Sequence, residues 1–330
     1  MFKIQFIHKY DNIISLENLL EAWKEFLRGK KKKTDVQIFE MNLMQNIISL
    51  HQDLKTKIYK HSEYQAFNIS DPKPRNIHKA KVRDRLLHHA LYRKLYAFFD
   101  RVFIADSYSC RLNKGTHKAI ERFRSFSNKV SKNNTRTCWV LKCDIRKFFA
   151  NIDHNILKQI LAEYIADEDV LWLLARVIDS FHTKGKVGVG LPLGNLTSQL
   201  LVNIYMNKFD QFVKHKLKAK YYIRYADDFV ILSPDRKQLE SLLLLIEAEL
   251  SEKLALNLHP NKVSIETLAS GIDFLGWVNF TKHRVLRTST KKRMIKRLKE
   301  SLTLETTNSY LGLLKHGNAH KLKRRLFCKN

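Results

Sequence analysis

Residues 221–232, YYIRYADDFVIL, decide the fold. Two runs of apolar and aromatic residues flank a short polar tip, which is the pattern of a β-hairpin. Asp227 and Asp228 lie at this tip, directly after Tyr225 and Ala226. By themselves the two acids have a simple explanation, because aspartate is favoured in turns for local backbone reasons.

A second strand is expected upstream, in residues 138–150, CWVLKCDIRKFFA. Alternate positions from Trp139 to Ile145 share one side of an extended chain, while Lys142 and Asp144 face the other side. Asp144 is therefore expected among apolar neighbours, where an unpaired carboxylate is costly. A cation that joins Asp144 to the hairpin acids would remove this cost.

Three converging acids suit a hard divalent cation. Mg²⁺ prefers oxygen ligands, takes few carboxylates and completes its shell with water and substrate phosphate oxygens. Two such ions, about 3.5–4 Å apart, activate an attacking 3′-hydroxyl and stabilise a leaving pyrophosphate. The three acids thus predict phosphoryl transfer by polymerisation, with two Mg²⁺ ions as cofactors and Mn²⁺ as a substitute.

The charge of the chain predicts a polyanionic partner. Among its 330 residues, 60 Lys and Arg oppose 32 Asp and Glu, which gives a formal net charge of +28. Repulsion on this scale opposes a compact state unless a polyanion offsets it, so nucleic acid is the leading partner. A hydrophobic fraction of 44% excludes a disordered chain.

The cysteines and the N-terminus indicate the compartment. The four cysteines have neither paired metal-ligand spacing nor the density of a disulfide framework, which favours a reducing compartment. The first residues, MFKIQFIHKYDN, lack the apolar core of a signal peptide, and no apolar run is long enough to span a bilayer. We therefore expect a soluble, cytoplasmic protein without membrane contact.

The remaining chain is expected to be mostly helical. Apolar residues at helical spacing predict helices over 16–27, 39–59, 82–98, 196–213 and 241–254. Residues 272–286 predict another hairpin, around Lys282. From Thr290 onward the sequence predicts a helical tail with one apolar and one basic face, which suits a clamp that follows a nucleic acid backbone.

The motif YADD at 225–228, together with CDIRKFF at 143–149, resembles the palm of reverse transcriptases. Further matches follow in family order. They are PKPRNIHKAKVRDRLLHHAL at 72–91, DSYSCRLNKGTHKAI at 106–120, GLPLGNLTSQLLVNIY at 190–205, LNLHPNKV at 256–263 and FLGW at 274–277. The resemblance implies an RNA-directed DNA polymerase.

One block indicates the subfamily. LGNLTSQ at 193–199 has Leu193 where most relatives have glutamine, and Gln199 where they have proline. With SYLGLLKHGN at 309–318 and the helix near the N-terminus, this departure resembles the reverse transcriptases of diversity-generating retroelements. The resemblance implies copying of a template-repeat RNA into cDNA with errors concentrated at adenines. It also implies mutagenic retrohoming, in which the cDNA diversifies a target gene.

The matched motifs imply roles for individual residues. Asp144 and Asp227 would hold the metal ions, with help from the Ile145 backbone and, less directly, from Asp228. Lys262 would protonate the leaving pyrophosphate.

The incoming nucleotide would meet residues from several motifs. Lys73 and Arg75 match the fingers loop that grips the triphosphate, and Phe149 would place a ring under the sugar that excludes a ribose 2′-hydroxyl. Leu193 cannot hydrogen-bond the nascent pair as glutamine does, so discrimination there would depend on shape. The full nucleotide-binding set is Lys73, Arg75, Arg146, Lys147, Phe148, Phe149, Leu193, Gly194 and Gln199.

Simpler explanations of these residues stay open. A basic loop at Lys73 and Arg75 is also explained by solvation, Phe149 by core packing, and Leu193 by packing without a role in fidelity. For the template and primer, the resemblance implies contacts from Arg83, Arg85, Tyr225, Gly276 and Trp277.

The expected architecture is an α+β right-hand polymerase. It comprises an N-terminal helical extension (1–60), fingers (61–137), a palm with an antiparallel sheet and part of the fingers (138–284), and a short helical thumb (285–330). The partners implied by the resemblance are template RNA, cDNA, dNTPs and a small basic accessory protein that assembles as an oligomer.

Two alternatives remain. The chain is also compatible with a reverse transcriptase of the group II intron or defence-associated type, and neighbouring genes would separate these from the retroelement type. From another class of function, it is compatible with a non-catalytic RNA-binding scaffold on a polymerase fold. The intact set of three acids favours an enzyme over the scaffold.

Overall fold

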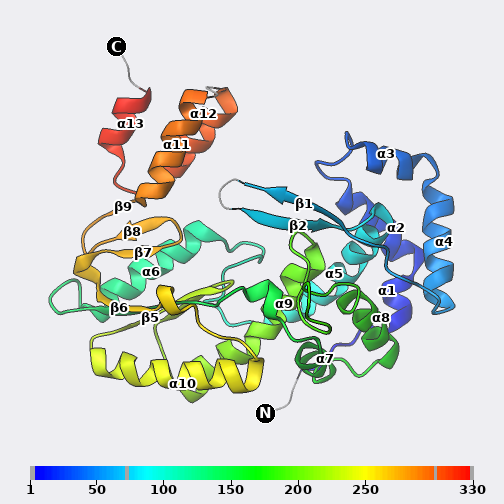
Figure 1. Cartoon of the computed structure of the whole chain (residues 1–330), viewed down its shortest axis with the longest axis horizontal. Coiled ribbons are helices and arrows are strands. Elements are labelled where there is room, and N and C mark those ends of the chain that lie inside the picture. The colour runs from blue at the N-terminus through cyan, green and yellow to red at the C-terminus, as the bar shows by residue number, and fades with distance from the viewer. Residues whose placement is uncertain (1–3, 71–73, 301–302, 328–330) are drawn as a thin grey trace. The chain divides into compact units, whose positions relative to one another are not determined.

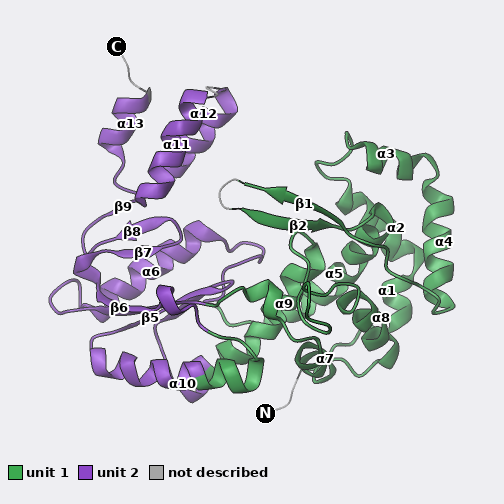
Figure 2. Ribbon diagram, viewed as in Figure 1, with its two compact units in different colours: residues 1–105, 145–212, 248–257 green, residues 106–144, 213–247, 258–330 purple. Residues whose placement is uncertain are grey.

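The computed structural model describes residues 4–70, 74–300 and 303–327 and divides into two compact units (Figures 1 and 2). Unit 1 comprises residues 1–105, 145–212 and 248–257, and unit 2 comprises residues 106–144, 213–247 and 258–330. Each unit therefore combines segments that are distant in the sequence. The α+β class expected from the sequence is confirmed.

Unit 1 is mostly helical. Its longest helix, α5 (Val82–Val102), packs against α2 (Leu16–Phe26) and α9 (Leu196–Gln211). Apolar side chains at helical spacing line α5, and eleven of its residues are buried. The other elements are α1 (Tyr10–Ile14), α3 (Thr34–Met41), α4 (Leu43–Lys55), the short 3₁₀ helix η1 (Phe148–Asn151), α7 (His154–Ala162), α8 (Glu168–Ile178), and the hairpin of β1 (Gln65–Ile69) and β2 (Arg75–Lys79).

The single helix predicted over residues 39–59 is wrong. The structure has two helices there, α3 and α4, because Asn42 leaves the helical region with φ −119° and ψ 40°. Asparagine side chains compete with the backbone for hydrogen bonds, which favours an interruption at such a position.

Unit 2 contains a four-stranded antiparallel sheet with the strand order β4–β5–β3–β6 (Figure 1). The hairpin predicted at 221–232 forms β4 (Tyr222–Tyr225) and β5 (Asp228–Ser233), and the strand predicted at 138–150 forms β3 (Trp139–Asp144). The fourth strand is β6 (Ser264–Thr267). Both predictions are confirmed, and the structure adds that β3 and β5 are neighbours.

Helices cover both faces of this sheet. On one face, Phe123 and Val130 of α6 (Thr116–Val130) pack with Val140 and Val230 in an apolar cluster. On the other side, α10 (Arg236–Leu254) begins with the Arg236 guanidinium 5.2 Å from the centre of the Trp139 ring (Figure 1). Alternation along β3 and β5 therefore has an apolar partner on each side.

After the sheet, the hairpin predicted around Lys282 is confirmed, but the region contains one strand more than predicted. Residues 272–286 form a three-stranded meander of β7 (Ile272–Phe274), β8 (Trp277–Asn279) and β9 (Arg284–Leu286). The additional turn is at Leu275 and Gly276, whose φ angles are +51° and +85°. Glycine adopts such angles at little cost, which permits the tight turn.

The basic tail is helical, as predicted, and consists of α11 (Thr288–Glu300), α12 (Leu304–Leu314) and α13 (His320–Phe327). Met294 and Leu298 of α11 are buried together with Trp277 and Leu314. Leu302, expected on the same apolar face, lies outside the described residues. None of the helices in the described ranges is long and apolar enough to cross a membrane.

Candidate active site

The strand register brings the predicted acids together in unit 2. Asp144, the last residue of β3, lies directly opposite Asp228, the first residue of β5. Residues in this relation have Cβ atoms about 4.5–5.5 Å apart and share one face of the sheet. Because Tyr225 pairs with Asp228, the hairpin loop consists of Ala226 and Asp227 alone. The third acid therefore adjoins the facing pair.

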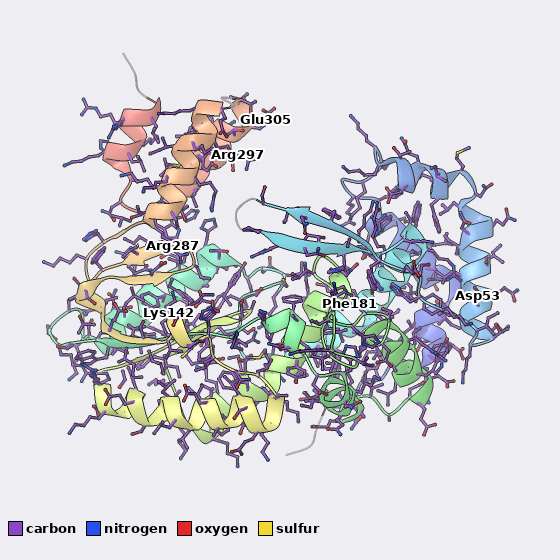
Figure 3. The ribbon with its side chains drawn as sticks, viewed as in Figure 1. Asp53, Lys142, Phe181, Arg287, Arg297 and Glu305 are labelled. Atoms are coloured by element: carbon purple, nitrogen blue, oxygen red, sulfur yellow. The ribbon has the colours of Figure 1, made fainter. Side chains whose placement is uncertain are left out.

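The carboxyl group of Asp228 is buried and has a raised pKa. Burial, followed by the negative charges of Asp227 and Asp144, raises its pKa to about 7, although the cations of Lys142 and Arg287 oppose this shift (Figure 3). Its Oδ1 atom is buried and accepts no hydrogen bond from the described residues. A buried carboxylate oxygen without a donor is unfavourable, and a bound cation would relieve it.

Asp144 has a cationic neighbour of its own. Lys262 Nζ donates to Asp144 Oδ1 at 2.9 Å, and the Asp144 carbonyl accepts from the His259 backbone N–H at 2.7 Å. The residue expected to protonate pyrophosphate therefore lies against a carboxylate expected to bind metal. Lys262 occupies the position of a counter-charge to Asp144.

These residues fit a divalent cation that is completed by substrate. In the described ranges, no three His, Cys, Asp or Glu side chains form a preformed metal cage. Mg²⁺ does not require one, since it is commonly held by one or two carboxylates with water and substrate phosphates supplying the rest. The facing Asp144 and Asp228 and the orphaned Asp228 oxygen match that mode of binding.

Arg224 is a residue of this site that the sequence did not single out. Its side chain is completely buried, with Nη1 donating to the Ala226 carbonyl at 3.1 Å and Nη2 donating to Ser107 Oγ at 3.1 Å. Ala226 has φ +57°, a left-handed conformation that is strained for a residue with a Cβ atom. Arg224 therefore stabilises the strained loop that carries Asp227.

The sequence did contain a signal for Arg224. A cation in the middle of an apolar strand is seldom buried without hydrogen bonds. This signal predicts a buried partner for Arg224 but cannot identify it, because Ser107 is more than a hundred residues away in the chain.

The other predicted residues of unit 2 have varied surroundings. Tyr225 is half-buried, and its phenol oxygen accepts from Thr116 Oγ1 at 3.2 Å. The Gly276 carbonyl accepts from the Arg287 N–H at 3.0 Å. Trp277 is only 1% exposed and packs in the apolar cluster with Met294, so its indole has no free surface for a primer.

In unit 1, several predicted nucleotide residues lie in or beside a groove of about 390 Å³. Gly194 and Gln199 line it together with Arg85, a residue expected on the template, and the Leu193 carbonyl accepts from the His78 N–H at 3.0 Å. Gly194 has φ +100°, and a Cβ atom there would lie 2.7 Å from Ile77 Cγ2. Glycine is therefore required at this edge of the groove.

The two arginines expected on the template are paired with acids inside unit 1. Arg83 forms an ion pair with Asp53 of α4, which Figure 3 labels, and Arg85 forms one with Asp35 of α3. Each guanidinium also lies over an aromatic ring, Arg83 over Tyr59 and Arg85 over Phe26. A surrounding of this kind holds both side chains in place.

The residues after β3 belong to unit 1. Ile145 and Phe148 are buried, which for Phe148 supports a core role. Phe149 is half-buried, with its ring centre 5.6 Å from that of Phe148. Lys147 has φ +47°, and the Arg146 N–H donates to the Asn257 carbonyl at 2.9 Å. Arg75 is exposed at the start of β2, whereas Lys73 lies outside the described residues.

Comparison with known proteins decides the family. The family model described as "Reverse transcriptase (RNA-dependent DNA polymerase)" matches residues 58–279, about two thirds of the chain. This chain belongs to the reverse transcriptase family. The matched region contains all three acids and the groove residues from Phe67 onward.

The reverse transcriptase is similar to several curated proteins. Protein YkfC of Escherichia coli is 26% identical over 248 residues, covering 64% of this chain and 62% of YkfC. The group II intron-encoded protein LtrA of Lactococcus lactis is 24% identical over 232 residues, covering 67% of this chain and 37% of LtrA. The chain thus matches between about a third and three fifths of the length of these relatives.

A solved structure supports the fold. The reverse transcriptase aligns with an apo telomerase from Candida tropicalis, truncated from the C-terminal domain, with a TM-score of 0.53. The alignment covers 74% of this chain and 60% of the telomerase at 14% sequence identity. This alignment confirms the polymerase fold expected from the sequence.

The pKa of Asp228 gives a prediction for stability in the absence of metal. The folded reverse transcriptase holds this proton up to about pH 7, whereas the unfolded chain loses it near the ordinary aspartate pKa of 3.8. This contribution to stability is therefore complete at low pH and is lost as the pH rises toward 7. In EDTA, we expect Asp228→Asn to melt at a higher temperature than wild type, by a margin that grows from pH 5 to pH 7 and then levels. A margin independent of pH would contradict the assignment.

The Arg224 contacts give a second prediction. Arg224→Met removes the donor to the Ala226 carbonyl, and a small displacement of a catalytic group costs about 10²-fold in rate. We expect kcat for primer extension to fall by about this factor while KM for dNTP changes little.

The double variant Arg224→Met/Ala226→Gly separates two effects of Arg224. One is its effect on the position of Asp227, and the other is its effect on the stability of the fold. Glycine removes the strain of the positive φ, so the double variant should recover melting temperature without recovering kcat. Recovery of both together would show that Arg224 contributes to stability alone.

Proposed function

We propose that this chain is an RNA-directed DNA polymerase that extends a primer with dNTPs on an RNA template. The observation that carries the proposal is the register of β3 and β5, which sets Asp144 opposite Asp228 beside the Asp227 loop. Membership of the reverse transcriptase family supports the same conclusion.

The proposed metal ions are two Mg²⁺, held by Asp144 and Asp227 with the Ile145 carbonyl and Asp228 in support. Such ions supply activation of the 3′-hydroxyl and neutralisation of the leaving pyrophosphate when bound. Asp228 must lose its proton to take part, and the neighbouring Lys142 and Arg287 favour that loss. Lys262 Nζ would donate a proton to a pyrophosphate oxygen after leaving Asp144 Oδ1.

We further propose the diversity-generating retroelement type of reverse transcriptase. Support comes from LGNLTSQ at 193–199, where Leu193 and Gln199 replace the usual residues next to the groove in unit 1. In this proposal the enzyme copies a template-repeat RNA with errors at adenines and works with a small basic accessory protein. The nucleotide and template roles of Arg75, Arg83, Arg85, Arg146, Lys147, Phe149, Tyr225 and Gly276 belong to the same proposal.

A second candidate is a reverse transcriptase of the group II intron type. The observation in its favour is the similarity to LtrA, whose name describes a group II intron-encoded protein. A template repeat beside a matching variable repeat near the gene would favour the retroelement type, and an intron around the gene would favour the second candidate.

Incorporation on a supplied RNA template tests the polymerase proposal. With Mg²⁺ and dNTPs, wild type should extend an annealed primer, whereas Asp227→Ala should bind the same RNA with unchanged affinity and fail to extend it. Asp235→Ala removes an exposed acid shortly after β5 and is the matched control, with extension as in wild type. Equal extension by Asp227→Ala and wild type would overturn the proposal, as would no extension by wild type.

The retroelement proposal gives a prediction for fidelity. Leu193→Gln restores an amide that can hydrogen-bond the nascent pair, an interaction worth about 1–3 kcal/mol in a buried site. We expect misincorporation opposite template adenine to fall by about one to two decades in cDNA sequencing. Leu193→Met, which keeps the size without the amide, is the control and should retain the errors. Unchanged adenine errors in Leu193→Gln would reject the role of Leu193.

A further inference from the structure

Unit 2 contains a partly open cavity that shares no residue with the three acids. Its walls come from the second half of α6, the β8–β9 turn at residues 280–283 and Asn318 before α13. The volume of the cavity is about 60 Å³. Because one water needs about 10–15 Å³, about five atoms of that size fit. A phosphate group, with one phosphorus and four oxygen atoms, has this size.

The lining of this cavity is cationic. Arg124, Lys282 and Arg284 contribute to it, and the described residues that line it include no acid. Asn128, Asn279, Thr281 and Asn318 supply polar groups around the cations. A small cavity with several cations and neutral polar groups is suited to an anion.

Arg284 provides an independent observation. Its side chain is 8% exposed, and Nη2 donates to Glu121 Oε1 at 2.7 Å. Its Nη1 atom is buried and has no hydrogen-bond partner among the described residues. A buried guanidinium N–H without an acceptor is unfavourable, because it has lost its hydrogen bonds to water. An anion in the cavity would supply negative charge beside this group.

The rim of the cavity favours a nucleotide unit over an isolated ion. The Phe280 and His283 rings stack in the β8–β9 turn, with centres 4.7 Å apart and planes 12° apart. Both residues line the cavity, and His283 is exposed. Aromatic surface beside a phosphate site is the usual combination for single-stranded nucleic acid, because it contacts the sugar or base next to the phosphate.

We propose that this cavity binds one backbone phosphate of a bound RNA, away from the three acids. The inference rests on the proposed function only in taking RNA as the partner. Arg124 and Lys282 attract the phosphate from the rim, and Arg284 holds it from within.

Equilibrium binding of a labelled RNA hairpin, measured by fluorescence anisotropy from 50 to 200 mM KCl, tests this proposal without catalysis. Loss of one phosphate contact lowers the slope of log affinity against log salt by about 0.7–0.9. We expect the double variant Arg124→Gln/Lys282→Gln to show this decrease and to bind the RNA about three- to tenfold more weakly at 50 mM. Both substitutions replace exposed side chains, so the fold should persist.

The double variant Lys118→Gln/Lys129→Gln is the matched control, because it also removes two positive charges, and both lysines are exposed on α6 but do not line the cavity. It should leave the slope unchanged, and an equal decrease in both variants would overturn the proposal in favour of general attraction. Measurements in the Asp227→Ala background should give the same result, which separates this test from failure of the polymerase proposal.

Inorganic phosphate, titrated by calorimetry, distinguishes a free ion from an RNA phosphate. Weak phosphate binding that is lost in Arg124→Gln/Lys282→Gln, together with the altered RNA slope, supports the proposal. If this double variant loses phosphate binding but keeps the wild-type salt dependence of RNA affinity, the cavity binds a free phosphate ion. This result would overturn the proposal.

Discussion

The structure depends on two carboxylates that face each other across adjacent antiparallel strands. Asp144 and Asp228 share a register position, and like charges in this relation destabilise a sheet. Three features of the fold reduce the repulsion between the two carboxyl groups. Asp228 keeps its proton up to about pH 7, Lys262 pairs with Asp144, and Lys142 and Arg287 lie close enough to affect Asp228. Each arrangement would change if a divalent cation bound there, which supports the proposal that the pair holds metal.

The sheet around this pair is built to keep the acids in place. Apolar residues of β3 and β5 pack on α6, and the rigid strands fix the separation of the acids. The third acid lies on a loop of only two residues, and that loop is strained at Ala226. Arg224 holds the Ala226 carbonyl from inside the unit, so the position of Asp227 depends on a buried cation whose second partner, Ser107, is distant in the chain. Strain of this kind persists only where the surrounding structure over-determines it.

Local pattern predicted much of this arrangement. Alternation along 138–150 and 221–232 predicts β3, β4 and β5, and helical spacing predicts α5 and α9, because each side chain pattern reports its own element. Pairing between distant elements was not predictable in the same way. The Lys262–Asp144 contact, the Arg224–Ser107 hydrogen bond and the ion pairs of Arg83 and Arg85 each join residues dozens of positions apart. In a chain with 60 cations, the sequence cannot show which of them meet one of the 32 acids. Trp277 illustrates the same limit, since the motif that suggests a primer contact belongs to a side chain buried under α11.

We propose that Asp144, Asp227 and Asp228 together form a divalent cation site when primer, template and nucleotide are bound. Anomalous scattering from Mn²⁺ in crystals of that complex, with a non-hydrolysable dNTP, measures this most directly. We expect Mn²⁺ peaks within coordination distance of Asp144 and Asp227, with Lys262 Nζ displaced from Asp144 Oδ1. Peaks elsewhere, or an Asp144 carboxylate that still binds Lys262 and faces away from the metal, would contradict it.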